Sequence, residues 1–508
     1  MLKKVLFVQP FVLDKEQLSN LVLVWSIYLE NYLKSKIENL STDLLYLPIE
    51  KQDCKIKINS LEEKESFFSQ MNNLVSDLKF EIDEKTYICI SGTTSHHFLP
   101  AKLIAEYFQK NYPKSIVIFG GAHASACPNS FSYIDSPIDY LIIGEGEVIL
   151  YEIIRDSYKK PQNTRIAVGK PIQKLDNLPP LELSLLDKYI PFFNDLSISL
   201  SRGCPFNCSF CMEKSLSKST NTTKRWRVYS PKRAINEANI MTDYALKNNI
   251  NIVGFYDPTF GANKKWLRKF LELYNPNSDI AATWIETRID AVDENLLRSL
   301  KKNKIYQMYG LESLSPYMLS VMDKTVNPVK FLEKFDRIFK IHEDLEYMFM
   351  ANVLFNHPGE TNATYNESYE GLRKIFGKDK NDIALFNIRY YHHYPGTRVY
   401  NNIEYFNKKY GCNDYFPRWW ENEKLLQDAP YCIRPSFELS LRESIEIYTD
   451  VFAKLSNINV NILKQNKRDK YFQKIVMHKK GIKKIYELKE RLLKFLDEYH
   501  IELEENNN

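Results

Sequence analysis

Short apolar runs rich in β-branched residues alternate with helix-length amphipathic segments along most of this 508-residue chain. Such alternation is typical of βαβ units, in which crossover helices join parallel strands. Because a chain of this length exceeds what one hydrophobic core supports, two or three domains are expected. The predicted strands are Val5–Val8, Leu44–Leu47, Tyr87–Ile90, Ile116–Phe119 and Tyr140–Ile143, followed by Leu196–Leu200, Ile250–Tyr256, Ala281–Glu286, Ile305–Tyr309, Tyr347–Leu354 and Ile383–Tyr391.

The grouping of these strands predicts an α/β architecture in three parts. Residues 1–160 are expected to form a Rossmann-like doubly wound parallel sheet, and residues 195–400 a partial (β/α)6 barrel. Residues 161–194, rich in Pro, Asp and Leu, are expected to be a linker, and residues 401–508 a mostly helical region. Ligands of such sheets bind at the carboxyl ends of the strands, so the loops there are the candidate sites.

Three cysteines lie on the loop that follows the strand Leu196–Leu200. Cys204, Cys208 and Cys211 have the spacing Cys-x3-Cys-x2-Cys. Three thiolates on one loop can hold three irons of a cubic [4Fe–4S] cluster and leave the fourth iron open to a substrate. A structural zinc site would need a fourth Cys or His close by, and the following turn has none. The spacing therefore predicts a cluster with an open iron; the alternative is three unrelated buried cysteines.

The loop from Arg202 to Cys211 resembles the signature of radical S-adenosylmethionine (SAM) enzymes. The polar and glycine-rich strand ends that follow resemble the radical SAM core of the cobalamin-dependent class, over about residues 195–400. The resemblance implies that Phe210 lies against the adenine of SAM and that residues near Asp257 surround its amino group. It makes Arg288 and Glu312 candidates for contacts with the carboxylate, ribose or amino group; the alternative is a structural ion pair between neighbouring strand ends.

Glycine-rich turns follow the strands of the first 160 residues. Gly120-Gly121 and Gly144-Glu-Gly-Glu147 let the backbone approach a bulky ligand where a Cβ atom would collide. With Gln9-Pro10-Phe11 and Ser91–His97, these turns are similar to the loops of the cobalamin-binding domain that precedes many radical SAM cores. The resemblance implies that cobalamin is bound by Ser91, Gly120, Gly121, Gly144, Glu145 and Gly146.

The first loop departs from the pattern of typical cobalamin domains, because Pro10 to Asn20 contains no histidine to ligate cobalt. The resemblance then implies either a cofactor held base-off without a histidine ligand or a domain that has lost the cofactor. His96, His97 and His123 lie on the relevant loops and are interpreted as hydrogen-bonding caps rather than cobalt ligands. Methylthiotransferases hold a second cluster with three cysteines in their N-terminal domain. Here Cys54, Cys89 and Cys127 are interpreted as packing residues, since Cys89 lies in mid-strand and no cysteine follows the first strand.

The composition fits a cytoplasmic enzyme. Hydrophobic residues make up 44% and charged residues 26%, and the net charge of +5 is small for this length. Eight cysteines in a chain of this size are no disulfide framework. Apolar runs stay well short of about 20 residues, so no membrane-spanning segment is expected. Because the net charge is small, no nucleic-acid partner is expected either. The lysine-rich run Lys464–Lys494 is interpreted as a solvated helix face. In enzymes of the resembled class the C-terminal region shapes the substrate cavity, so the resemblance implies that Trp419, Trp420 and Tyr431 line it.

The resemblance implies a cobalamin-dependent radical SAM enzyme, most often a C-methyltransferase acting on an unactivated carbon of a natural product or peptide. Its cofactors would be a [4Fe–4S] cluster, SAM and cobalamin, and its electron donor an external flavodoxin or ferredoxin. Alternatives are a ring-forming or rearranging enzyme with the same cofactors, a radical SAM enzyme with an empty N-terminal domain, and a non-enzymatic iron–sulfur or cobalamin sensor. The sequence identifies neither the substrate nor a catalytic side chain.

Overall fold

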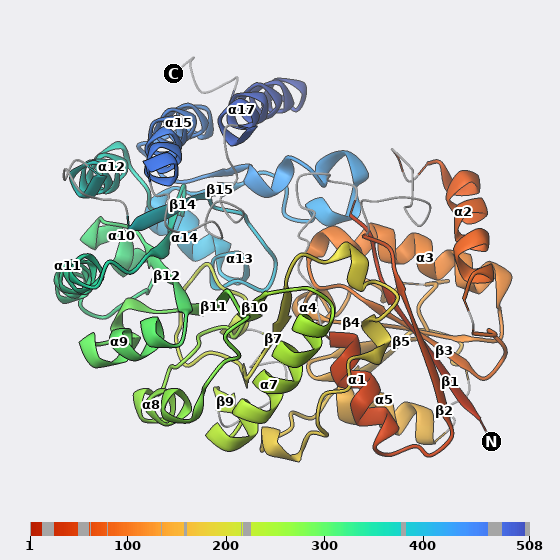
Figure 1. Cartoon of the computed structure of the whole chain (residues 1–508). Coiled ribbons are helices and arrows are strands. Elements are labelled where there is room, and N and C mark those ends of the chain that lie inside the picture. Colours follow the sequence, from red (N-terminus) through yellow and green to blue (C-terminus); the bar gives the residue numbers. More distant parts are fainter. Residues whose placement is uncertain are drawn as a thin grey trace.

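The computed structural model describes residues 2–12, 25–48, 60, 62–78, 80–133, 135–156, 160–214, 216, 225–376, 383–465 and 480–502. Two parallel sheets, each of six described strands, make up most of it. In Figure 1 the first sheet, in red and orange, lies beside the second, in green and teal, and the blue C-terminal helices α15 and α17 lie above the second. The predicted α/β fold class is therefore confirmed.

The first sheet has the strand order β2-β1-β3-β4-β5-β6, with every neighbouring pair parallel. The chain leaves β1 to form β2 on one side and returns to form β3 on the other, which creates a switch point where doubly wound sheets bind ligands. Val5 to Val8 are completely buried, because helices cover both faces. Its elements are β1 (Lys3–Gln9), α1 (Trp25–Lys34), β2 (Leu40–Tyr46), α2 (Lys64–Ser76), β3 (Thr86–Ser91), α3 (Phe98–Asn111), β4 (Ile116–Gly120), α4 (Ala122–Ala126), β5 (Tyr140–Ile143), α5 (Gly146–Arg155) and β6 (Arg165–Val168).

Strand β6 lies in the segment for which a linker was predicted. It pairs with β5 at the edge of the sheet, and its apolar side chains Ile166 and Val168 are 47% and 55% exposed. An exposed edge strand this short leaves no burial pattern in the sequence, which is why it was missed. The following residues Leu175 and Leu178 are buried, so this part of the segment packs against the protein.

The second sheet has the order β14-β13-β12-β11-β10-β7, again with parallel neighbours. Strands β7 and β14 remain the two edges, as expected for an incomplete barrel. Asp293 and Ser315 cap helices α9 and α10 by accepting backbone N–H groups of their first turns. Its elements are β7 (Leu196–Ile198), α7 (Pro231–Lys247), β10 (Ile252–Phe255), α8 (Lys264–Leu273), β11 (Ala282–Thr287), α9 (Glu294–Lys302), β12 (Ile305–Glu312), α10 (Pro316–Val321), α11 (Pro328–Asp344), β13 (Phe349–Phe355), α12 (Asn362–Phe376) and β14 (Ala384–Tyr390).

Side chains of the second sheet alternate between its two faces. One set packs against the outer helices as part of the main core, for example Ile285, Tyr309 and Val353. The other set faces the concave side, where Trp284, Met350 and Leu385 form a separate apolar cluster. We call this cluster the barrel floor; its members are Ile252, Ala282, Trp284, Met348, Met350 and Leu385, with Tyr306 and Met308 packed against them.

The C-terminal region touches both sheets. Helix α15 (Leu441–Gln465) packs on β14, and α17 (Lys480–Glu498) packs on α15. The short 3₁₀ turn η6 (Trp419–Glu421) reaches α3 of the first sheet. Within the described residues, no helix combines the length and apolarity needed to cross a membrane. The remaining elements are β8 (Ser201–Arg202) paired with β9 (Arg227–Val228), α13 (Arg398–Asn401), α14 (Ile403–Tyr410), and β15 (Asn413–Asp414) paired with β16 (Ile433–Arg434).

Candidate active site

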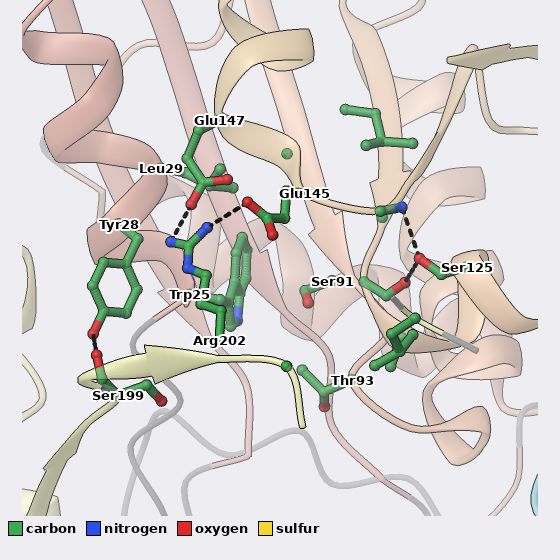
Figure 2. A pocket seen from close by; sticks show the side chains of 18 of the residues that line it. Trp25, Tyr28, Leu29, Ser91, Thr93, Ser125, Glu145, Glu147, Ser199 and Arg202 are labelled. Atoms are coloured by element: carbon green, nitrogen blue, oxygen red, sulfur yellow. Dashed lines mark hydrogen bonds and ion pairs between the residues drawn. The ribbon is translucent and has the colours of Figure 1, made fainter. Parts of the chain in front are cut away.

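A cavity of about 640 Å³ lies between the carboxyl edges of the two sheets. One wall comes from α1 and from the ends of β3, β4 and β5, and the other from β7, β8, β10 and β11. In Figure 2, Trp25 and Tyr28 of α1 lie in the same pocket as Ser91, the last residue of β3, and Thr93, and Arg202 enters this space from the second wall. The cavity therefore sits where both sheets present their ligand-binding ends.

All six residues predicted to bind cobalamin line this cavity: Ser91, Gly120, Gly121, Gly144, Glu145 and Gly146. Gly121 has φ +102°, and a Cβ atom there would lie 2.9 Å from the carbonyl oxygen of Gly92, so a side chain is excluded by the backbone itself. At Gly120 a Cβ atom would lie 3.6 Å from that of Ile142, an ordinary contact, so this glycine leaves open space on the cavity side. We call these six residues the glycine wall.

The three predicted cluster cysteines lie together on the loop after β8. The antiparallel pair β8–β9 fixes the start of the loop, and Gly203, with φ +77°, turns the chain into Cys204. The Cys211 N–H donates to the carbonyl of Cys208 at 3.3 Å, and Cys204 Sγ lies 3.3 Å from Thr259 Oγ1. All three are free thiols. Burial raises the pKa of Cys211 to about 12 and also raises that of Cys208.

This loop fits the chemistry of a [4Fe–4S] cluster. The three cysteines lie on one short loop as free thiols, so each can bind a different iron as a thiolate. Among the described residues, no group of three His, Cys, Asp or Glu side chains converges as the ligands of one metal ion would. A cluster does not require such convergence, because each thiolate binds a different iron.

Two buried cations lie beside the cysteines. The positive charges of Lys324 and Arg288 both oppose the rise in the pKa of Cys208. The Arg288 guanidinium lies 3.8 Å from the ring centre of Phe206, within the cysteine loop. It donates to both carboxylate oxygens of Asp290, at 2.8 and 2.9 Å. We call Arg288, Lys324 and their carboxylate partners the charged edge.

The sequence alternatives for Arg288 and Glu312 were a contact with SAM and an ion pair with each other. Each residue is in an ion pair, but with a different partner: Arg288 with Asp290, and Glu312 with Lys324 at 2.9 Å. Arg288 also donates to the carbonyl of Lys324 at 2.7 Å. Both residues are thus held beside the cysteine loop, and their contact with SAM stays a prediction.

Phe210 and Asp257 do not line the cavity. Phe210 packs among Met318, Leu354 and Tyr410, close to the third cysteine. Asp257 is buried behind the cavity wall and accepts the backbone N–H of Ser201, which anchors the strand that leads into the cysteine loop. Burial raises the pKa of Asp257 to about 7.

An ion-pair network joins the glycine wall to the cysteine loop (Figure 2). Arg202 donates to Glu145 at 3.0 Å and to Glu147 at 2.5 Å, and Arg227 pairs with the same Glu145. Burial alone would raise the pKa of Glu145, but the hydrogen bond from Arg227 and the charge of Arg202 outweigh it, so this pKa is lowered. Both carboxylates sit at the N-terminal end of α5, where negative charge is favoured.

The loop histidines lie outside the cavity lining, which includes no histidine among the described residues. His123 contacts the hydroxyls of Ser95 and Ser130 at 2.9 and 3.2 Å, and burial lowers its pKa to about 3. His96 and His97 are likewise buried, and their pKa values are lowered to about 4 and about 3. This arrangement fits a corrinoid held without a histidine ligand.

The aromatic residues expected around the substrate do not line this cavity. Trp419 and Trp420 are buried, with ring centres 4.7 Å from His96 and 5.7 Å from His123 respectively. Tyr431 packs on His392 at 4.3 Å. These residues join the C-terminal region to the two sheets, and none of them lines the cavity.

Of the three cysteines considered for a second cluster, Cys89 is buried in β3 and Cys127 is half-buried after α4. Cys54 lies outside the described residues.

Several residues of the site were not singled out from the sequence. Lys324 follows α10 and Arg227 forms β9, and no motif marks either residue. Glu286 on β11 lines the cavity, and no hydrogen bond or ion pair of its carboxylate occurs within the described part of the chain. The one available signal was position, because Glu286 ends a predicted strand on the face that alternation assigns to Trp284.

Comparison with known proteins agrees with this geometry. The sequence profile described as the radical SAM superfamily matches residues 198–372. The uncharacterized methyltransferase PH0819 of Pyrococcus horikoshii is 30% identical over 376 residues, which are 69% of this chain and 75% of that protein. The anaerobic magnesium-protoporphyrin IX monomethyl ester cyclase of Rubrivivax gelatinosus is 25% identical over 296 residues, 51% of this chain and 49% of the cyclase.

A solved structure has a similar fold. The radical S-adenosylmethionine methyltransferase TsrM from Kitasatospora setae, with cobalamin and a [4Fe-4S] cluster bound, superposes with a TM-score of 0.57. The match has 15% identity and covers 81% of this chain and 77% of TsrM. With this fold, the profile match and a relative at 30% identity over most of its length, the chain belongs to the radical SAM superfamily.

Proposed function

We propose that this protein is a cobalamin-dependent radical SAM methyltransferase that acts on an unactivated carbon of a small molecule or peptide. One observation carries the proposal. The cavity has the glycine wall on one side and the start of the cysteine loop on the other, so a corrinoid and a SAM-binding cluster would face each other across it. Methyltransferases among the relatives, PH0819 and TsrM, support the reaction class.

The cofactors would divide the chemistry: the cluster and SAM generate a carbon radical on the substrate, and the corrinoid carries the methyl group. The protein's own residues hold and separate these groups. Cys204, Cys208 and Cys211 would bind three irons, while Arg288 and Lys324 balance the negative charge of the thiolates. Ser91 and the four glycines of the glycine wall present backbone and one small side chain, which permit close approach of a flat macrocycle.

The concave face of the second sheet is the proposed substrate site. Its barrel floor is apolar and lies outside the cavity lining, while Glu286, on the same face of β11 as Trp284, lines the cavity. Asn387 donates to Asn352 at 2.8 Å on the same face of the sheet, which adds amide groups to the concave face. A mostly apolar concave face with a few polar groups would exclude water from a radical and orient a small substrate. The electron would come from an external flavodoxin or ferredoxin.

Labelled SAM tests the proposal. Protein reconstituted anaerobically with iron, sulfide and hydroxocobalamin would be incubated with methyl-deuterated SAM, a reductant and extract from cells that lack this gene. We expect a deuterated product, together with S-adenosylhomocysteine and 5′-deoxyadenosine in about equal amounts, because each methylation consumes one SAM for each of the two roles. SAM cleavage without label in any product would contradict methyl transfer.

Ring formation is the second candidate, because a relative is named a cyclase and matches half of this chain. Such a reaction needs no methyl donor. It predicts 5′-deoxyadenosine without S-adenosylhomocysteine in the same assay.

A further inference from the structure

The ion-pair network between the two walls is built from mostly buried side chains. The side chains of Arg202 and Glu147 are 20% and 5% exposed, and those of Arg227 and Glu145 are 6% and 17% exposed. Ion pairs on a protein surface contribute little, whereas loss of one partner of a buried pair leaves an uncompensated charge. This network is therefore a firm link between α5 and the start of the cysteine loop.

Arg202 is held on several sides at once. Its guanidinium lies 5.5 Å from the ring centre of Tyr28, and the Tyr28 hydroxyl donates to the carbonyl of Ser199 at 3.1 Å. Only Gly203 separates Arg202 from Cys204, the first predicted cluster ligand. A displacement of Arg202 therefore moves the first thiol.

The partners of Arg202 belong to the cavity wall. Glu145, Gly146 and Glu147 all line the cavity, as do Arg202 and Gly203. Glu145 also accepts the backbone N–H of Ile172 at 3.1 Å, and Arg227 donates to the Ile172 carbonyl at 2.6 Å. The wall that a corrinoid would touch and the loop that would hold the cluster thus share one set of charged side chains.

We propose that Arg202 is a positioning residue that couples occupancy of the cavity by a corrinoid to the placement of the first cluster cysteine. The inference rests on the proposed function, because it requires both cofactors. A corrinoid against the glycine wall would hold the side chains of Glu145 and Glu147 in place. These carboxylates would then hold the guanidinium of Arg202, and Arg202 would set the position of Cys204. The competing explanation is that the network only fastens the two sheets together, in which case each cofactor binds independently of the other.

Coupling between two sites is reciprocal, so it can be measured as a change in affinity. The dissociation constant of hydroxocobalamin would be determined for the full-length wild-type protein with and without its reconstituted cluster. We expect binding to be about fivefold or more tighter with the cluster present, within the usual range of coupling between sites. As a second readout, bound hydroxocobalamin should slow the loss of cluster iron to a chelator by a similar factor. Neither measurement depends on substrate or turnover.

Glu147→Gln breaks one link of the network and keeps the shape of the side chain. We expect this variant to bind each cofactor. The ratio of its dissociation constants for hydroxocobalamin without and with the cluster should fall toward one. Arg155→Gln is the matched control: Arg155 is on the same helix, and its pair with Asp156 is exposed. It should keep the wild-type ratio. Arg202→Lys keeps the charge but loses the two-pronged geometry, and should reduce the ratio even if Glu147→Gln folds poorly.

Equal dissociation constants in the wild type with and without the cluster would overturn the coupling and leave the proposed function standing. An unchanged ratio in both Glu147→Gln and Arg202→Lys would assign the coupling to other residues and overturn the role of Arg202. If the wild type holds no cobalamin in either form, the proposed function itself fails, and the inference fails with it.

Discussion

The glycine wall, which lines the cavity, and the charged edge, which lies beside the cysteine loop outside the cavity lining, are built from different kinds of group. Apart from Glu145, whose carboxylate is paired with Arg202 and Arg227, the glycine wall offers backbone, a small side chain and positive-φ turns, so it selects a ligand by shape. The charged edge around the cysteines offers guanidinium, ammonium and carboxylate groups already paired with one another, so it selects by charge. We therefore expect ligand binding at the glycine wall to be sensitive to added side-chain volume. Binding at the charged edge should be sensitive to the loss of a charged group.

The largest effect is expected at the cysteine loop itself. Cys208→Ala removes one of three thiolates that hold the cluster, so we expect complete loss of the visible absorbance of the cluster and of SAM cleavage. Cys127→Ala is the control, since Cys127 lies outside the cavity lining and should leave the iron content per chain unchanged. Retention of wild-type 5′-deoxyadenosine production by Cys208→Ala would refute the assignment of the cluster.

Added volume tests the glycine wall. Gly120→Val places a branched side chain where the structure leaves room, so we expect hydroxocobalamin affinity to fall by about tenfold or more, with Gly120→Ala in between. Equilibrium dialysis and iron content would be measured together. Gly121 is unsuitable, because any side chain there meets Gly92 and strains the backbone. A Gly120→Val protein that binds cobalamin as tightly as the wild type would show that this wall does not contact the corrinoid.

A variant that loses a positive charge tests the charged edge. Arg288→Gln removes the guanidinium next to Phe206, and we expect the KM for SAM in 5′-deoxyadenosine formation to rise by about tenfold, the effect of one charge-assisted hydrogen bond. Arg298→Gln, which breaks an exposed pair with Glu294, serves as the control. If KM stays constant while cluster yield drops, Arg288 supports the loop and does not bind SAM.

The smallest effect is a pH dependence of stability at Asp257. Its pKa is about 7 in the folded protein, against about 4 in an unfolded chain. Between these values the folded protein keeps a proton that the unfolded chain has released, so the stability contributed by Asp257 falls as the pH rises from about 4 to 7. Across this range, the melting temperature of cluster-free wild type should drop a few degrees more than that of Asp257→Asn. Parallel curves for the two proteins would contradict the raised pKa.

Local patterns in the sequence predicted most of the fold and part of the site. Alternating apolar runs end in glycine or polar residues, which is why the second sheet and the loops that carry the glycine wall were found in advance. The assignment of these loops to cobalamin came from the resemblance and stays a prediction. Edge strand β6 was missed because it is short and because its exposed Ile166 and Val168 leave no pattern of burial in the sequence. Lys324 and Arg227 reach the site only through the packing of distant segments, which no local pattern encodes. The same holds for Trp419, which the resemblance placed at the substrate cavity and which packs on His96.

The contact of η6 with the first sheet has a consequence for the order of events during synthesis. Trp419 and Trp420 leave the ribosome long after His96 and His123, on which they pack. At usual elongation rates of about 5–20 residues per second, the first sheet can fold many seconds before this contact becomes possible. The C-terminal region therefore packs on the first sheet only after both walls of the cavity have been synthesised, and the ion pairs of Arg202 with Glu145 and Glu147 can join the two walls before it does.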